Sequence, residues 1–167
     1  MTSAVICAYG RSPFTPANKG QLAKMRPDDL LAQVVKGVLA KAAFNAADIE
    51  DMIVGCAFPE GEQGFNIGRM TALLTGLPLT VAGSTINRWC GSSMEAIHMA
   101  AGKIITGSGE LFIAAGVESM SRIPMGGFNP SPNPDLYEVM PNAYLSMGLT
   151  AENLAKKFNI ARAEQEK

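Results

Sequence analysis

Cys90 is the residue of this sequence whose type and position best suit a nucleophile. It stands in the stretch INRWCGSSMEAIHMAA (86–101), where a strand-like run meets a helical pattern. A thiol in the first turn of a helix lies among unpaired backbone N–H groups at the positive end of the helix dipole, which lowers its pKa. The same N–H groups can stabilise an oxyanion. On position alone, however, Cys90 is equally compatible with a small, buried apolar residue.

His98, the only histidine of the sequence, is too distant to serve Cys90 as a base. Eight residues along one helix correspond to about 12 Å, which is far beyond hydrogen-bond reach of the sulfur. We therefore expect His98 to be a polar-face or half-buried residue. Cys7 and Cys56 lie within or at the ends of apolar runs, and we interpret both as structural. If Cys90 is a nucleophile, its base lies outside this sequence.

The composition excludes several functional classes. Of the 167 residues 47% are hydrophobic and 17% are charged, with a net charge of −1, which gives no electrostatic basis for binding nucleic acid or an anionic membrane. Three widely spaced cysteines without a CxxC pair or a histidine cluster argue against a disulfide framework and a metal site. Because no signal peptide or membrane span is recognisable, a cytoplasmic protein is expected. The low charge content predicts that a partner subunit or a further part of the protein covers some of the surface.

Strand-like and helical segments alternate as far as residue 117. Apolar runs predict strands over 4–10, 48–56, 81–86 and 111–117. Helical spacing predicts three helices between them: one that begins at Pro27, one that Asn66 caps, and one that follows Cys90. In the third helix the apolar residues on one face are Met94, Ile97, Ala101, Ile104 and Ile105. This order predicts an α/β fold with a mostly parallel sheet and helices on its faces.

The sequence changes character after Glu118. Residues 119–142 are rich in Pro, Gly, Asn and Met and have no periodicity, which predicts a long functional or disordered loop. Helical spacing returns over 148–158, where Thr150 is a candidate N-cap. The last residues, ARAEQEK, are typical of the start of another helix but lack a stop signal. We therefore expect the sequence to be cut off rather than complete.

Five ordered motifs resemble those of the thiolase family. NRWCGSSMEAIHMAAGKIITG is similar to the active-site signature N-x-x-C-G-S-[SG], which carries the acyl-accepting cysteine. Four further segments resemble, in order, the first helix, the second helix, the start of the inserted loop domain and a segment near the substrate: RPDDLLAQVV, EQGFNIGRMTALLTGLP, GVESMSRIPM and MGLTAENLAKKFNIAR. EQGFNI and NRWCGSSM are most similar to the N-terminal part of degradative 3-ketoacyl-CoA thiolases (acetyl-CoA acyltransferases) of fatty-acid β-oxidation. Biosynthetic acetoacetyl-CoA thiolases, the alternative, commonly have His where Ser146 stands here.

The resemblance implies a division into domains and a reaction. Residues 1–119 would form the N-terminal half of a thiolase-like α/β/α layered fold with a mixed, mostly parallel sheet, and residues 120–167 the beginning of the inserted loop domain. The Cys90 thiolate would attack the 3-keto carbonyl of a 3-ketoacyl-CoA, with its own backbone N–H in an oxyanion hole. Acetyl-CoA would leave, and coenzyme A would then take the acyl chain from the cysteine. Met147 would line the pocket near the thioester, with a core methionine as the alternative.

The resemblance also implies partners. Coenzyme A and acyl-CoA would be substrates, with no cofactor and no metal. Family members form dimers through the strand before the nucleophile, here 81–87, so a homodimer or tetramer is expected. The family's other catalytic groups, a Gly-His-Pro histidine and a cysteine in a Cys-x-Gly context, do not occur in this sequence, so the chain alone should not turn over. A non-catalytic, acyl-CoA-binding module of the same fold is the alternative from another functional class.

Overall fold

Three parallel strands form the sheet of this protein, whose computed structural model describes residues 3–167. β1 (Asp51–Gly55) lies between β2 (Ala82–Ile86) and β3 (Phe112–Gly116). All strand pairings in the described residues are parallel, and they bring Gly55 opposite both Ile86 and Gly116. The predicted parallel sheet is confirmed, although β1 is shorter than the run 48–56 because a 3₁₀ turn, Ala46–Asp48, precedes it.

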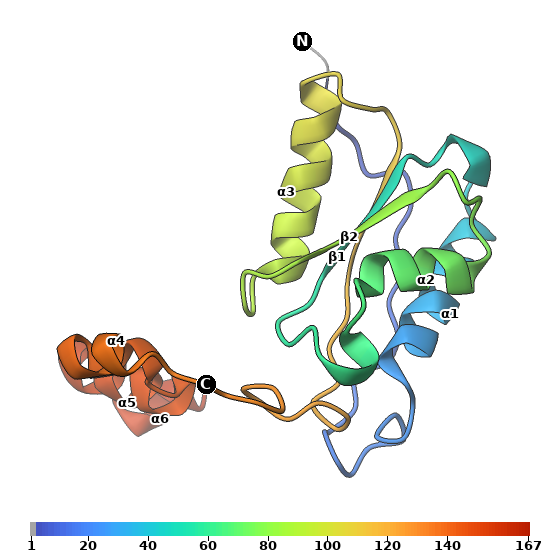
Figure 1. Cartoon of the computed structure of the whole chain (residues 1–167). Helices are drawn as coiled ribbons and strands as arrows, with labels where there is room; N and C mark the ends of the chain where they lie inside the picture. The colour runs from blue at the N-terminus through green and yellow to red at the C-terminus, as the bar shows by residue number, and fades with distance from the viewer. Residues whose placement is uncertain (1–2) are drawn as a thin grey trace. The chain divides into compact units, whose positions relative to one another are not determined.

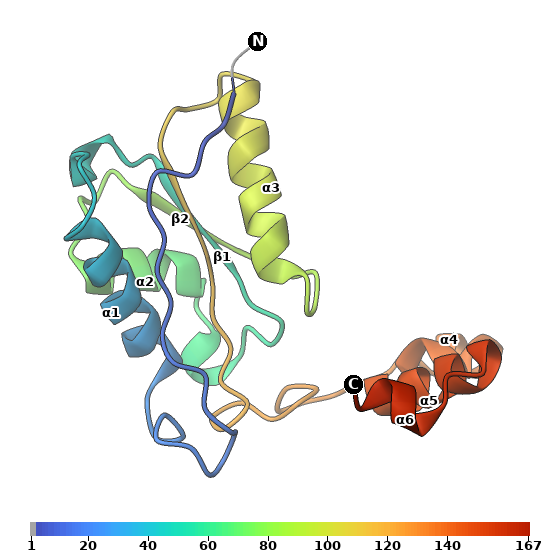
Figure 2. The same cartoon turned by 180° about the vertical axis from the view of Figure 1, so that it is seen from behind.

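Helices cover both faces of this sheet (Figures 1 and 2). α1 (Pro27–Leu39) and α2 (Ile67–Thr75) lie on one face, and α3 (Ser92–Ile105) lies on the other. Side chains of β1 alternate between the two layers: Met52 and Val54 join the core beside α1 and α2, whereas Ile53 packs against α3. All five residues of β1 are buried, as expected for a central parallel strand that is covered on both sides. The chain therefore has the expected α/β layered fold.

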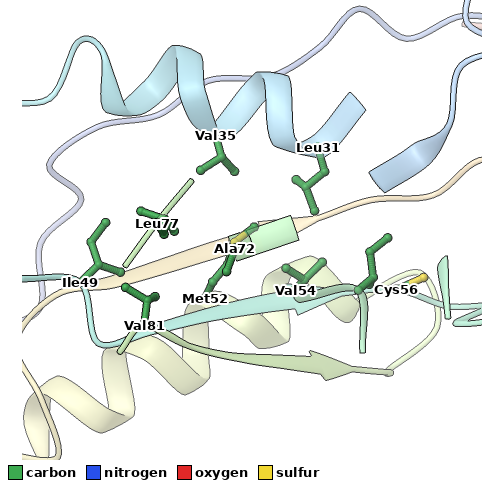
Figure 3. Packing of buried hydrophobic residues seen from close by; sticks show 10 residues of the cluster. Leu31, Val35, Ile49, Met52, Val54, Cys56, Ala72, Leu77 and Val81 are labelled. Atoms are coloured by element: carbon green, nitrogen blue, oxygen red, sulfur yellow. The ribbon is translucent and has the colours of Figure 1, made fainter. Parts of the chain in front are cut away.

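The larger core lies between β1 and the pair of helices α1 and α2 (Figure 3). Leu31 and Val35, one turn apart on α1, point toward β1 and pack in the same core as Met52 and Val54. The remaining buried members come from α2 and the loops at the strand ends: Ile49, Cys56, Ile67, Ala72, Leu77 and Val81. The opposite core is smaller, because α3 contributes only alanines to it.

The helix ends agree with the signals in the sequence. Pro27 occupies the first turn of α1, where a missing backbone N–H costs nothing. The Asn66 side chain accepts a hydrogen bond from Arg69 N–H at the start of α2, and Gly76 ends that helix in the left-handed region with φ +85°. These caps confirm the predicted second helix.

Residues 4–10 do not form the predicted strand. They run as irregular chain, and the side chains of Val5, Ile6 and Tyr9 are 73%, 76% and 90% exposed. An apolar run becomes a strand only where a neighbouring strand satisfies its backbone N–H and C=O groups. No strand of the described sheet pairs with this segment, so the prediction is wrong for the chain as it stands.

The apolar face predicted for α3 does not lie on the sheet. The residues that α3 buries are Ser92, Ala96 and Ala100. On the opposite side of the helix, the side chains of Met94 and Ile105 are 60% and 59% exposed. Small residues face the sheet because the helix approaches it closely, so the larger apolar side chains point outward.

The second compact unit, Asn129–Lys167, is helical, and it is described here by itself. α4 (Pro134–Val139) and the 3₁₀ helix η3 (Pro141–Tyr144) stand where a structureless loop was expected. Asn133 explains α4, because its side chain caps the helix by accepting Leu136 N–H at 2.9 Å. α5 (Met147–Phe158) and α6 (Arg162–Gln165) confirm the later helices.

The cap of α5 is Ser146, not Thr150. The Ser146 side chain accepts Leu149 N–H at 3.4 Å, while the Thr150 hydroxyl lies inside the helix and donates to the Ser146 carbonyl at 3.0 Å. Thr150 is in the first turn of the helix, where a hydroxyl can bond back to a carbonyl four residues earlier. No helix in the part of the chain that is described is both long and apolar enough to cross a membrane.

Residues that precede the second unit pack with the sheet unit, which is Met1–Phe128. Ile123 is 1% exposed, and Phe128 N–H donates to a Glu60 carboxylate oxygen at 2.6 Å. In the sequence, the boundary between the compact units therefore lies between Phe128 and Asn129. The assignment of 1–119 and 120–167 to two thiolase domains stays a prediction.

Candidate active site

Cys90 lies in the tight turn that joins β2 to α3. β2 ends at Ile86, α3 begins at Ser92, and Gly91 is the residue that caps the helix. Cys90 therefore immediately precedes the cap, instead of lying in the first helical turn as expected. Its side chain is exposed, so Cys90 does not belong to a core of the described residues.

Side-chain hydrogen bonds hold the turn in shape. Asn87 Oδ1 accepts Trp89 N–H at 2.9 Å. Ser92 Oγ accepts Arg88 N–H at 2.8 Å and donates to the Trp89 carbonyl at 2.6 Å. Trp89 has φ +46°, a left-handed conformation that is unfavourable for a bulky residue and persists only where neighbours impose it. The turn is thus a strained element, held from both sides of Trp89.

The hydrogen bonds of the turn leave the Cys90 N–H available. Gly91 and Ser92 N–H donate to the carbonyls of Arg88 and Trp89, both at 3.0 Å. Among the described residues, no acceptor is recorded for the N–H of Cys90. A free N–H beside an exposed thiol, just before the N-terminus of a 14-residue helix, is a geometry that can bind a developing negative charge.

Two glycines allow the first turn of α3 to lie directly against the ends of the strands. A Cβ on Gly55 would lie 2.3 Å from the carbonyl carbon of Ser92, and one on Gly116 would lie 2.5 Å from Ser93 Cβ. Both glycines are the last residues of their strands. The close contact therefore places Cys90 at the carboxyl edge of the parallel sheet, where α/β proteins bind their ligands.

A second network lies at the same edge of the sheet, around Gln63. This side chain is fully buried, and its Nε2 donates to Glu118 Oε1 at 2.7 Å and to the Phe58 carbonyl at 2.8 Å. Its Oε1 accepts Ser119 N–H at 2.6 Å. The other oxygen of Glu118 accepts Ala57 N–H at 2.7 Å. Gln63 and Glu118 thus join the loops that follow β1 and β3.

Cys56, beside this network, is chemically protected. The residue is 1% exposed. Burial, followed by the negative charge of Glu118, raises the pKa of the Cys56 thiol to about 12, so it stays protonated and unreactive at neutral pH. Its buried, structural character agrees with expectation. Cys7 is exposed in the irregular N-terminal segment instead.

Comparison with known proteins identifies the family. A family model described as the thiolase N-terminal domain matches residues 4–167. This chain belongs to the thiolase N-terminal domain family.

Named relatives of this thiolase domain are longer than the chain. The 3-ketoacyl-CoA thiolase of Bacillus subtilis (strain 168) is 47% identical over 166 residues, which are 99% of this chain and 42% of that protein. A 3-ketoacyl-CoA thiolase of Saccharophagus degradans is 45% identical over 159 residues, 95% of this chain and 40% of that protein. The crystal structure of the Bacillus anthracis acetyl-CoA acetyltransferase superposes with a TM-score of 0.82 at 32% identity, covering 99% of this chain and 44% of that one. The chain thus spans less than half the length of these relatives.

The other residues singled out from the sequence of this thiolase domain lie away from Cys90 or in the second unit. His98 is exposed on α3, in agreement with a polar-face residue. Met147 is the first residue of α5 and is 68% exposed, so it is not a core methionine of its unit. Its place in a substrate pocket stays a prediction.

Sequence reasoning missed Asn87, Gln63 and Glu118. A signal for Glu118 was present, because it is a carboxylate directly after the apolar run 111–117, at the edge where parallel strands carry functional groups. Nothing comparable marks Gln63, which lies in the loop FPEGEQGF. Its role follows only from contacts with residues 55 and 56 positions further along the chain.

Proposed function

We propose that this chain supplies Cys90 as the acyl-accepting nucleophile of a 3-ketoacyl-CoA thiolase. The observation that carries the proposal is an exposed thiol beside a free backbone N–H, in a turn held rigidly at the carboxyl edge of the sheet. The relatives named 3-ketoacyl-CoA thiolase, at 45–47% identity, support the substrate class. Ser146, which caps α5 here, favours the degradative over the biosynthetic assignment.

The proposed reaction is the exchange of one carbon–carbon bond for a thioester. The Cys90 thiolate adds to the C3 carbonyl of a 3-ketoacyl-CoA, and the Cys90 N–H stabilises the oxyanion that forms. The C2–C3 bond then breaks, its electron pair goes to C2, and protonation of C2 gives acetyl-CoA. The thiolate of a second coenzyme A attacks the acyl-cysteine, which releases the shortened acyl-CoA and restores the Cys90 thiolate.

The proposed reaction needs a base for the thiols and an acid for C2. His98 is the only histidine of the chain and lies within α3, about 9 Å along the helix axis from its first residue Ser92, whereas Cys90 lies in the turn before the helix. We therefore assign both roles to the larger part of a complete thiolase that this chain does not span. By the same proposal, the chain alone is inactive, and coenzyme A is a substrate with no further cofactor.

The proposal also includes a pathway, a cellular location, an oligomeric state and a role for Met147. We assign the protein to fatty-acid β-oxidation in the cytoplasm, as a homodimer or tetramer that associates through residues 81–87. β2 lies at one edge of the described sheet, and an edge strand offers unpaired backbone groups to a second copy. Met147 is proposed to line the pocket near the reacting thioester.

Thiolysis by the complete gene product that contains this chain tests the proposal. Long-chain 3-ketoacyl-CoA should be cleaved in the presence of coenzyme A, and an acyl adduct should be found on Cys90 by peptide mass spectrometry. Cys90→Ala should abolish both, whereas Cys7→Ala, the matched exposed cysteine, should abolish neither. A preference for acetoacetyl-CoA would favour the biosynthetic alternative, and acyl-CoA binding without turnover or adduct would favour the non-catalytic module.

A further inference from the structure

A chain of hydrogen bonds leads from Glu118 to the residue before Cys90. Glu118 Oε2 accepts the N–H of Ala57 at 2.7 Å, and the carbonyl of the same Ala57 accepts Asn87 Nδ2 at 2.8 Å. Asn87 Oδ1 in turn accepts Trp89 N–H at 2.9 Å. Glu118 therefore holds Ala57, Ala57 holds Asn87, and Asn87 holds the backbone of the turn.

Gln63 fixes Glu118, the residue at which this series of hydrogen bonds begins. Its Nε2 occupies the second oxygen of the Glu118 carboxylate at 2.7 Å, and its Oε1 is bound by Ser119 N–H at 2.6 Å. Glu118 is exposed while Gln63 is fully buried, so the buried amide provides the rigid anchor. Hydrogen bonds to an ionised carboxylate are the stronger kind, which suits a group that must hold a loop in place.

The turn needs such support because of Trp89. Its φ of +46° is a conformation that a large side chain leaves unless its surroundings hold it. The Trp89 ring contacts Phe58 edge-on, with ring centroids 5.4 Å apart, and Phe58 is also bound by Gln63 through its carbonyl. The hydrogen bond of the Trp89 N–H and the contact of its ring thus both lead to the pair Gln63–Glu118, while Ser92 holds the Trp89 carbonyl from the other side.

We propose that Glu118 and Gln63 are positioning residues for the Cys90 nucleophile, acting through Ala57 and Asn87 on the strained turn. This inference rests on the proposed role of Cys90. Neither side chain is required to touch the substrate. Their effect is on where the thiol and the Cys90 N–H point, and a misplacement of about 1 Å costs on the order of 100-fold in rate.

Swapping the glutamate and the glutamine between positions 118 and 63 tests the proposal, because it swaps hydrogen-bond donors and acceptors. In Glu118→Gln one carboxylate oxygen becomes an amide NH₂, which faces either the Ala57 N–H or the Gln63 amide, so one of the two hydrogen bonds is lost. Combining it with Gln63→Glu restores an acceptor opposite the new donor and keeps an acceptor for Ser119 N–H. The bonds from residue 63 to the Phe58 carbonyl and to the Cys56 sulfur stay broken. The double variant should therefore recover much of the function that E118Q loses.

The experiment uses the complete gene product that contains this chain. Hydrogen exchange of the peptide over residues 86–94 reports the turn, the rate of Cys90 alkylation reports the thiol, and thiolysis gives kcat and KM. E118Q should speed exchange, change the alkylation rate, and lower kcat about 10- to 100-fold with little change in KM. The matched control is Asp51→Asn, a second carboxylate-to-amide change on this sheet, at the opposite end of β1, where Asp51 pairs with Lys103 at 2.9 Å. It should leave all of these quantities as in the wild type.

Three outcomes would overturn the inference: wild-type exchange and alkylation in E118Q, equal effects of D51N, or no recovery in an exchanged pair that unfolds at the same urea concentration as E118Q. If E118Q does not fold, Asn87→Ala removes the next side chain in the same series of hydrogen bonds and should have the same effects. If the wild type performs no thiolysis, the proposed function fails. The exchange and alkylation measurements then still decide whether Glu118 positions the turn.

Discussion

Replacing Gly55 by alanine is the most direct perturbation of the way in which α3 is held on the sheet. The added Cβ would lie 2.3 Å from the carbonyl carbon of Ser92 and 2.4 Å from the nitrogen of Ser93. Carbon atoms in ordinary contact are roughly 3.5 Å apart, so the methyl group is about 1 Å too close. The opposing atoms belong to the backbone, so no side chain can rotate away. The first turn of α3 must move or β1 must distort.

The expected cost follows from this geometry. Overpacked cores typically lose about 1–3 kcal/mol, and a clash between backbone segments belongs at the upper end, about 3 kcal/mol. Gly102→Ala in the same helix is the matched control, because its Cβ would meet nothing within 4 Å. That change should stabilise the helix by about 0.5–1 kcal/mol. The two glycine-to-alanine variants should thus differ in stability by about 4 kcal/mol.

Urea unfolding followed by far-UV circular dichroism measures this difference. Since the displaced turn carries Cys90 with it, Gly55→Ala should also lower thiolysis on the order of 100-fold in the complete gene product, whereas Gly102→Ala should not. The reasoning is refuted if Gly55→Ala unfolds at the urea concentration of the wild type. In that case the approach of α3 to β1 is not the rigid contact that the structure describes.

Three further predictions concern single side chains. Because the pKa of Cys56 is about 12, iodoacetamide at neutral pH should label only the exposed cysteines, Cys7 and Cys90, in the folded chain. In urea it should label all three, as counted by peptide mass. Labelling of Cys56 in the folded protein would contradict its burial. A hydrogen bond from Arg122 holds the pKa of Glu62 below its usual range, so the stability that the Glu62 carboxylate contributes is complete above about pH 4.3 and is lost as the pH falls through the lowered pKa. The urea midpoint of Glu62→Gln should therefore depend less on pH in acid than that of the wild type. Equal dependence on pH in the two proteins would argue against the ion pair. Asn66→Ala removes the α2 cap and two hydrogen bonds to the segment of β2, so it should cost about 2 kcal/mol in thermal unfolding, and a loss near zero would show that the cap is dispensable.

Much of the sheet unit was predictable because its signals are local. β1, β2 and β3 are short strand-like runs, and single residues mark the helix starts: Pro27 begins α1 and Asn66 caps α2. The position of Cys90 between a strand and a helix was equally readable, because both signals are local to residues 81–105.

What could not be read depends on contacts between distant parts of the chain. The segment 4–10 has the composition of a strand, but only a neighbouring strand can make it one. The outward face of α3 results from the glycines Gly55 and Gly116, which let a helix with small residues lie on the sheet. The network of Gln63 and Glu118 joins positions 55 residues apart, and neither residue has a local pattern that indicates its partner.

The glycine contact between α3 and the sheet also has a consequence for how this site tolerates sequence change. Main-chain atoms carry much of the framework that locates the thiol: Gly55 at the end of β1 meets the backbone of α3, Gly116 at the end of β3 meets Ser93 Cβ, and the peptide groups of Ala57 link Glu118 to Asn87. The side chains of Asn87, Ser92, Gln63 and Glu118 complete that framework. Substitutions outside this framework can therefore accumulate without displacing Cys90, whereas one extra methyl group at the end of β1 or β3 moves the turn that carries it. The position of the Cys90 turn and the composition of the surface around it are therefore separately adjustable.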